Sequence, residues 1–206
     1  MLEHIPSWLG KALDGMRAGP DKLAVARPEL GSSFRALALS SPAFADGARL
    51  PERFTADGVG ASPPLVWGAA PEGTALFALL VEDADAPAPQ PLVHAVVWGI
   101  PADAGGLVEC AIVGDGVGSP DRDVGRNSYQ REGWLPPDPP TGHGSHRYVF
   151  QLFALSADVG APGETPGRAA IVEAMAGHVL AAGVLVGTYS RGEETPIGPI
   201  GAVVAA

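Results

Sequence analysis

The stretch Trp134-Leu-Pro-Pro-Asp-Pro-Pro-Thr-Gly-His-Gly-Ser-His-Arg-Tyr148 runs directly into the apolar segment Val149-Phe-Gln-Leu-Phe-Ala-Leu155. Prolines restrict the backbone and withhold hydrogen-bond donors, so the first stretch predicts a stiff surface loop, and the second predicts a buried strand. Side chains on a loop that a rigid scaffold supports are well placed to bind ligands. His143 and His146 make this loop a candidate site, although a solvated turn that happens to contain histidines explains the segment equally well.

Apolar runs like the one after this loop recur along the whole chain, separated by many of its 28 glycines and 21 prolines. The pattern predicts strands at 34–39, 65–67, 74–82, 94–100, 107–113, 147–155 and 184–190, and a helix at 167–182. The run at 74–82 is apolar almost throughout, which is typical of a strand buried on both faces. We therefore predict an all-β fold, a two-sheet antiparallel Greek-key β-sandwich with a few peripheral helices.

The N-terminal region has a different pattern. Residues 4–18 place apolar side chains at helical spacing, which predicts an amphipathic helix, and a connector leads from it to residue 33. We expect residues 1–33 to form this helix and connector, and residues 34–206 to form the main domain. The apolar face of the helix favours packing on the main domain, with a dimer contact or contact with a membrane surface as alternatives.

Composition excludes several classes of protein. The net charge of −10, from 13 basic and 23 acidic residues, argues against nucleic-acid binding, which requires clustered lysine and arginine. The sequence lacks the long apolar run of a membrane span and the leader of a secreted protein, so we expect a cytoplasmic protein. The single cysteine, Cys110, cannot form an internal disulfide, and its neighbours predict a buried strand position.

Two further candidate positions follow from the predicted strands. Asp83 and Asp85 come directly after the apolar run at 74–82, and we favour Asp83 for the pocket because Asp85 lies deeper in the turn. His94 begins the next strand and lies at the same edge as Asp83 if the two strands form a hairpin. Taken alone, His94 is more typical of a core histidine bonded to a backbone carbonyl, and only its convergence with the other candidates favours a site.

Three chemistries fit such a cluster. Two histidines and a carboxylate resemble a metal site, but their spacing in a loop is far less specific than a helical metal motif. Serines are available for a hydrolase, yet none lies in a Gly-x-Ser-x-Gly motif. The third chemistry is anion binding, with donors from the imidazoles, Tyr148 and backbone N–H groups near Gly142, and with Asp83 orienting a histidine.

These residues resemble the phosphatidylethanolamine-binding protein family, and most closely its bacterial, Raf kinase inhibitor-like branch. Asp83-Ala-Asp-Ala-Pro87 is similar to the family's Asp-Pro-Asp-Ala-Pro motif, and Pro139-Pro-Thr-Gly-His-Gly-Ser-His-Arg-Tyr148 is similar to its second signature, which ends in His-Arg-Tyr. His94 lies between them. The likeness spans residues 37–191 and leaves the N-terminal helix outside.

The resemblance implies a β-sandwich with a small anion pocket at one end that accepts phosphate-like groups, including phospholipid headgroups. The pocket residues it implies are Asp83, Pro87, His94, Pro140, His146 and Tyr148, and the residues at the rim or behind the pocket are Asp85, Gly142 and His143. The resemblance also suggests a cis peptide bond between Ala86 and Pro87, an arrangement that is found mainly in tight turns.

We therefore expect a non-enzymatic binding protein without cofactor or metal. The alternatives are a kinase or protease modulator that acts through contact with a protein partner, and a small hydrolase or metal enzyme that uses the same cluster. A homodimer is left open.

Overall fold

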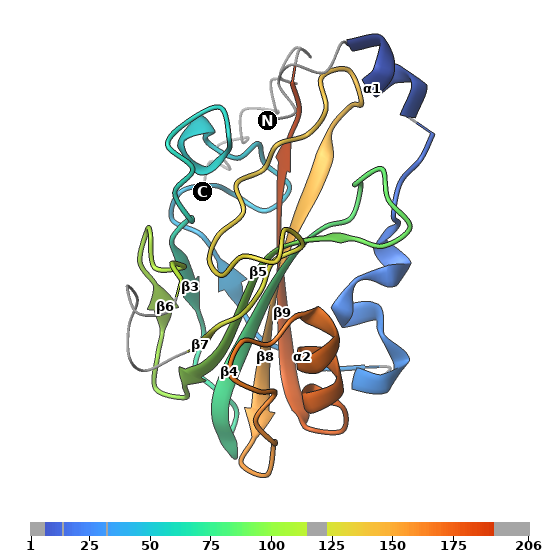
Figure 1. The fold of residues 1–206 in the computed structure, drawn as a ribbon. Coiled ribbons are helices and arrows are strands. Elements are labelled where there is room, and N and C mark those ends of the chain that lie inside the picture. The colour runs from blue at the N-terminus through green and yellow to red at the C-terminus, as the bar shows by residue number, and fades with distance from the viewer. Residues whose placement is uncertain (1–6, 14, 32, 115–122, 192–206) are drawn as a thin grey trace, which may run out of the picture.

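The computed structural model describes residues 7–13, 15–31, 33–114 and 123–191. Its two sheets, drawn in Figure 1, have six and three strands, and helices are few. The larger sheet has the order β1-β9-β8-β4-β5-β7, and its strands are β1 (Arg35–Ala36), β4 (Thr74–Asp83), β5 (Leu92–Pro101), β7 (Asp123–Val124), β8 (His146–Ser156) and β9 (Val179–Tyr189). The smaller sheet has the order β2-β3-β6, with β2 (Leu39–Ser40), β3 (Leu65–Trp67) and β6 (Gly106–Leu107). The predicted two-sheet all-β fold is confirmed.

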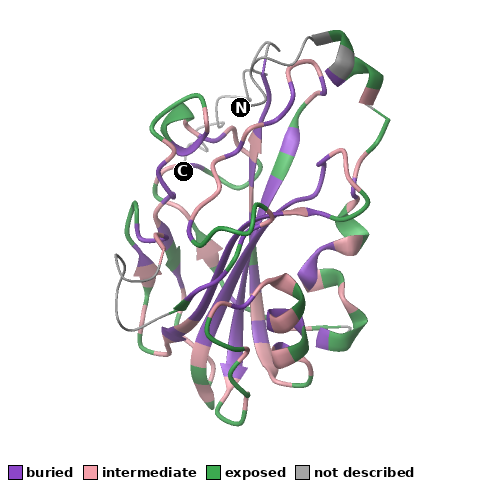
Figure 2. Ribbon diagram, in the orientation of Figure 1, coloured by how far each residue is buried: buried purple, intermediate pink, exposed green. Residues whose placement is uncertain are grey.

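All strand pairs are antiparallel except the parallel pair of β1 and β9 at one edge. The expected hairpin of β4 and β5 is present, and β8 lies on the other side of β4. The three central strands are therefore neighbours, and Figure 2 shows them buried over most of their length.

The central strands are apolar on both faces because each face has a cover. Alternate residues of a strand point to opposite faces. In β4, Phe77, Leu79 and Val81 belong to the core between the two sheets, while Ala78 and Leu80 belong to a second core under the helices. The near-continuous apolar run of β4 is the sequence signature of this double burial.

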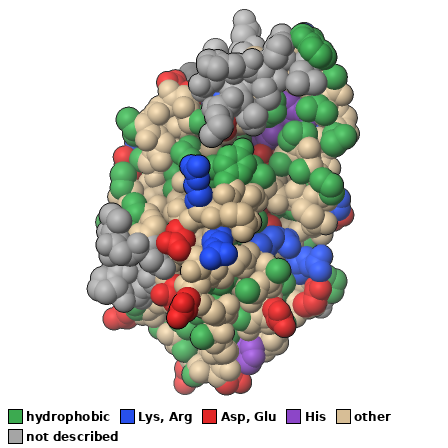
Figure 3. Space-filling model, viewed as in Figure 1, with side chains coloured by type: hydrophobic (Ala, Val, Ile, Leu, Met, Phe, Trp, Pro, Cys, Tyr) green, Lys and Arg blue, Asp and Glu red, His purple; other side chains and the backbone are tan. Residues whose placement is uncertain are grey.

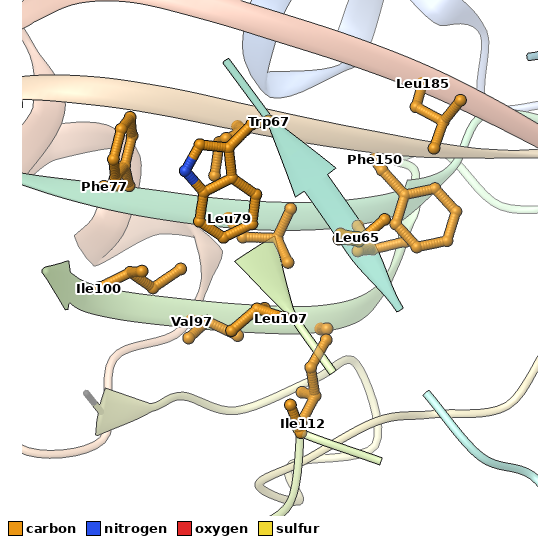
Figure 4. Packing of buried hydrophobic residues seen from close by; sticks show 14 of the residues in the cluster. Leu65, Trp67, Phe77, Leu79, Val97, Ile100, Leu107, Ile112, Phe150 and Leu185 are labelled. Carbon is orange, nitrogen blue, oxygen red and sulfur yellow. The ribbon is translucent and has the colours of Figure 1, made fainter. Parts of the chain in front are cut away.

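The core between the sheets is shown in Figure 4. Leu65 and Trp67 from β3 pack against Phe77 and Leu79 from β4, and the indole of Trp67 meets the ring of Phe77 edge to face at 5.6 Å. Fully burying one such side chain contributes about 1.5–3 kcal/mol to stability. The core continues along β8 and β9 through Phe150 and Leu185.

The helical elements are α1 (Ser7–Leu13), α2 (Arg168–Met175) and the 3₁₀ turns η2 (Pro20–Lys22), η3 (Ala24–Ala26), η4 (Pro28–Leu30) and η5 (Glu52–Phe54). Figure 1 shows α2 lying against the larger sheet, where Ile171 and Met175 are fully buried. Ala24 and Leu30 of the connector pack into the same core. Among the described helices, none is long and apolar enough to cross a membrane.

Two predicted elements have different bounds in the structure. The helix expected at 167–182 ends at Met175, because Gly177 takes a φ of 78° and reverses the chain into β9, which begins at Val179. The strand expected at 107–113 ends at Leu107. After it the chain turns outward through Cys110, whose φ is 63°, and the prediction that this cysteine is buried is wrong.

The N-terminal helix is also shorter than expected. Of the range 4–18, residues 4–6 and 14 lie outside the described part of the chain, and α1 ends at Leu13. Gly15, just beyond this end, disfavours a longer helix, because glycine lowers helix stability. Gly10 lies against the loop before β8, where an added Cβ would stand 2.2 Å from the carbonyl oxygen of Thr141.

Candidate functional site

On the face of the larger sheet that forms the core between the sheets, polar side chains follow the apolar ones at one end of the strands. On β4, Asp83 follows Phe77, Leu79 and Val81 on the same face, and on β8, His146 and Tyr148 share a face with Phe150. Asp83 pairs directly with Tyr148 across the two strands. The polar side chains therefore lie at the open end of the apolar core.

His94 reaches the same face through an irregularity in β5. Val93 pairs with Glu82 and Ala95 pairs with Val81, so His94 is an extra residue without a partner in the β4–β5 register. Such a bulge redirects a side chain relative to regular alternation. His94 and Ala95 consequently face the same side, with Ala95 in the core and His94 beside the polar cluster.

A cavity of about 390 Å³ opens at this end. All of the residues that we predicted for the pocket line it: Asp83, Pro87, His94, Pro140, His146 and Tyr148. Its remaining walls are largely apolar, with Leu92, Leu135 and alanines of the turn after β4 among them. In Figure 3, hydrophobic side chains gather toward the top of the visible face, next to histidine atoms.

The hydrogen bonds of His94 determine which of its nitrogens faces the cavity. Its Nδ1 lies 2.6 Å from the carbonyl oxygen of Leu135, and the N–H of Leu135 donates to the carbonyl of His94 at 2.8 Å. A carbonyl only accepts, so Nδ1 carries the proton and the neutral ring presents a lone pair at Nε2. Burial lowers the pKa of His94, although the charge of Asp83 opposes that shift, so neutral His94 is favoured.

Tyr148 supplies a hydrogen-bond donor, whereas the neutral His94 ring presents an acceptor. Its ring is fully buried and meets His94 edge to face at 5.0 Å. Burial raises the pKa of Tyr148 well above its usual value, and the neighbouring Asp83 raises it further, so the O–H stays a donor. Within the described part of the chain, neither Tyr148 Oη nor His94 Nε2 has a hydrogen-bond partner.

Asp83 and His146 form a pair on the adjoining wall. Asp83 Oδ2 lies 2.7 Å from His146 Nδ1, and Asp83 Oδ1 accepts the backbone N–H of Asp85 at 2.8 Å. The other nitrogen of His146, Nε2, lies 2.7 Å from Nδ1 of His143. Both nitrogens of His146 are therefore bound to protein groups, and His143 stands behind the cavity wall rather than in it.

The residues expected at the rim do not line the cavity. Asp85 is buried and turned to Arg147, which binds it through the backbone N–H and the guanidinium at 2.7–2.9 Å. Burial alone would raise the pKa of Asp85, but the hydrogen bonds of Arg147 outweigh it and hold that pKa below its usual value. Gly142 has a φ of 81° and turns the loop. The Ala86–Pro87 bond is trans, so the expectation of a cis bond there is wrong.

The structure adds site residues that sequence reasoning missed. Tyr129, Arg131 and Asp138 line the cavity. Arg191, just beyond β9, binds Asp57, Asp138 and the carbonyl of Pro139, and so holds the proline-rich loop against the end of the sheet. Asp138, which prolines flank in the loop quoted at the start, was the one feature of the sequence that could have indicated this network. Its partner could not be found because it is 53 residues away.

Metal ligands are not clustered in the described residues: no group of three or more histidine, cysteine or acidic side chains there could hold a metal ion.

Comparisons with known proteins agree with this architecture. The family model described as phosphatidylethanolamine-binding protein matches residues 40–190. The UPF0098 protein of Methanothermobacter thermautotrophicus is 40% identical over 156 residues, which cover 75% of this chain and 99% of that protein. The UPF0098 protein Rv1910c of Mycobacterium tuberculosis is 40% identical over 153 residues, 74% of this chain and 70% of that protein.

Solved structures give the same result. The PEBP homolog CT736 from Chlamydia trachomatis matches with a TM-score of 0.67 and 31% identity, covering 76% of this chain and 98% of that one. YbcL of E. coli, described as a member of the mammalian PEBP family, matches with a TM-score of 0.70 and 27% identity, covering 76% and 99%. The match extends over most of the chain and includes every residue that lines the cavity, so this chain belongs to the phosphatidylethanolamine-binding protein family.

Proposed function

We propose that this protein binds a phosphate-like anionic group, free or as the headgroup of a phospholipid, in the cavity at the end of the sheet. The observation that carries the proposal is the pair of buried polar atoms, His94 Nε2 and Tyr148 Oη, that have no hydrogen-bond partner among the described residues. Buried polar atoms are normally hydrogen-bonded, and leaving one unpaired costs about 1–3 kcal/mol. A ligand that satisfies both atoms recovers that cost.

The geometry also supports a role for a proton in binding. An anion oxygen accepts hydrogen bonds, and Tyr148 can donate one directly. His94 can donate only after Nε2 takes up a proton, because its Nδ1–H is committed to the carbonyl of Leu135. The bound anion would therefore stabilise the charged form of His94, or would bring the proton itself as an acidic O–H.

The wall composition supports ligand binding. Apolar walls around a few polar atoms are typical of ligand pockets. We keep a cytoplasmic location and a regulatory role through a protein partner as predictions.

Titration with inorganic phosphate and with phosphoethanolamine tests the proposal. We expect both ligands to shift the ring resonances of His94. The variant Tyr148→Phe removes one hydrogen bond and should weaken binding about 3- to 10-fold, and His94→Leu, which removes a bond to a charged group, about 10- to 100-fold. His178→Leu is the matched control, because the partly exposed His178 pairs with Asp158, an exposed residue just after β8. Silence of the His94 ring at saturating ligand would sink the proposal.

Binding should also depend on pH. Inorganic sulfate keeps its charge between pH 5 and 8, so any pH dependence comes from the protein. Because the pKa of free His94 is lowered and the bound form is protonated, we expect the affinity to rise about tenfold per pH unit of acidification until that lowered pKa is reached. Isothermal titration in buffers of different ionisation enthalpy measures the proton uptake. Affinity that stays constant from pH 8 to pH 5 would refute a proton on His94.

A further inference from the structure

The wall behind the cavity is supported by a segment outside the family match. The N-terminal support, defined as Leu13 and residues 15–19, precedes the matched residues 40–190. Its Ala18 and Gly19 donate backbone hydrogen bonds to the turn after β4 at 3.0 and 2.9 Å. Its Arg17 donates to the carbonyls of His143 and Ser145 at 3.0 Å each. The support therefore joins the two loops that flank the cavity, and Figure 1 shows the chain after α1 running past both of them.

The same support fixes the ring of His143. The carbonyl of Leu13 lies 2.9 Å from Nε2 of His143, whose Nδ1 faces His146 Nε2 at 2.7 Å, and His146 Nδ1 faces Asp83 Oδ2 at 2.7 Å. These contacts form a continuous line from the N-terminal support to the cavity wall. The line is buried, since His143, His146 and Asp83 are exposed by only 0%, 1% and 3%.

Counting protons along this line gives an unusual result. The carbonyl of Leu13 only accepts, and each of the other two contacts requires one proton between its two atoms, because two lone pairs at hydrogen-bond distance repel. The three contacts therefore need three protons. Two neutral imidazoles and a carboxylate provide only two. With three protons, the set Asp83, His146 and His143 has no net charge, whichever atom holds the third. With two protons, the set has a charge of −1.

Most other charged groups near this line are paired with one another, and Arg131 also lines the cavity. Asp85 is bound by Arg147 and Arg17, and Asp138 is bound by Arg191. His94 and Tyr148, which also face Asp83, are uncharged in the free protein by the argument above. The proton count of the line thus decides whether Asp83 adds a negative charge to a cavity wall that also contains Arg131.

We propose that His143 is a positioning residue of the anion pocket: held by the carbonyl of Leu13, it keeps a third proton on the Asp83–His146–His143 line and so cancels the negative charge that Asp83 would present to a bound anion. This inference rests on the proposed anion binding and explains how a pocket with an aspartate in its wall accepts an anion. It assigns the N-terminal support a part in the chemistry of the pocket.

The first test counts protons in the wild-type protein without ligand. Nitrogen-15 NMR of the histidine rings, combined with carbon-13 NMR of the Asp83 carboxyl group, should show three protons on His143, His146 and Asp83 together. Two protons, as two ring N–H groups beside an ionised carboxylate, would overturn the proposal. This measurement is independent of ligand, so three protons in a protein that binds neither sulfate nor phosphate would refute the proposed function and leave the proton line standing.

The second test uses His143→Leu with sulfate as the probe. Without His143, the Asp83–His146 pair is satisfied by a single proton and regains its negative charge. We expect sulfate affinity about 100- to 1,000-fold below wild type at pH 8, since a unit charge about 4–6 Å away acts on this scale at an effective dielectric constant of about 20. The variant should take up one more proton per sulfate than wild type, and its deficit at pH 8 should shrink at pH 5, because solvent then supplies the proton.

A merely structural role of His143 predicts something else. If the loop were only loosened, affinity would fall by the same factor at every pH and proton uptake would not change, and either result overturns the proposal. Unchanged affinity at pH 8 overturns it as well. His178→Leu again serves as the control and should match wild type at both pH values. If His143→Leu fails to fold, as judged by circular dichroism, the proton count in the wild type decides.

Discussion

Replacing Arg168 with methionine is expected to lower the free energy of unfolding by about 3–5 kcal/mol, the usual cost of removing one partner of a buried ion pair. Arg168, the first residue of α2, donates to Glu82 Oε1 at 2.5 Å, and Glu82 is fully buried. Glu82 Oε2 also accepts hydrogen bonds from Gln151 and from the backbone of Ala24, both at 2.7 Å. Without the guanidinium, a carboxylate remains in the core under the helices with no cation to balance it.

Chemical denaturation of a double-mutant cycle measures this effect. Glu82→Gln combined with Arg168→Met removes both charges, so the double variant should be more stable than Arg168→Met alone. Arg53→Met is the matched control, because Arg53 forms an ion pair with Glu109 in which both side chains are more than two-fifths exposed. We expect it to change stability by about 0.5 kcal/mol or less. A loss of similar size in both single arginine variants would contradict the assignment.

Replacing Arg191 with methionine should lower the free energy of unfolding by about 2–4 kcal/mol and also weaken phosphate binding. The effect is smaller than for Arg168 because the side chain of Asp57 is 26% exposed and can be hydrated. Burial opposes the charge of Arg191, but the hydrogen bonds of Asp57 and Asp138 outweigh it and raise the pKa of Arg191. Binding suffers because Asp138 and Pro139, which Arg191 holds, line the cavity.

Arg191→Lys separates charge from geometry in this network. Lysine keeps the charge but lacks the planar group that binds Asp57 and Asp138 together, so we expect it to recover only part of the lost stability. Thermal unfolding with and without phosphate gives both quantities in one experiment. Full recovery with lysine would mean that charge alone matters there.

Strand alternation explains why much of the site could be predicted from the sequence. Apolar runs marked β4, β5 and β8, and the prediction that their polar ends meet at one edge follows from antiparallel pairing. The bulge at His94 was not predictable, because nothing in the local sequence distinguishes it from regular alternation. The resemblance implied the pocket residues, and all six of them line one cavity, while ligand binding by these residues stays a prediction.

Polar contacts between distant residues account for most of what was missed. Glu82 with Arg168 and Arg191 with Asp57 are separated by 86 and 134 positions, and single charged residues have no periodicity that would link them. The outward turn at Cys110 was missed for a different reason. Its hydrophobic neighbours Ala111 and Ile112 are buried as expected, but they enter the core from a loop instead of a strand.

The contacts of the N-terminal support also bear on folding. Arg17 contacts residues 126 and 128 positions later in the chain, and Val25 contacts Gln151, also 126 positions later. A contact of that separation cannot form until β8 has been synthesised and paired, because its loop-closure entropy is otherwise uncompensated. The N-terminal support can therefore dock only after β8 is in place, so the cavity wall that it holds is completed late in folding.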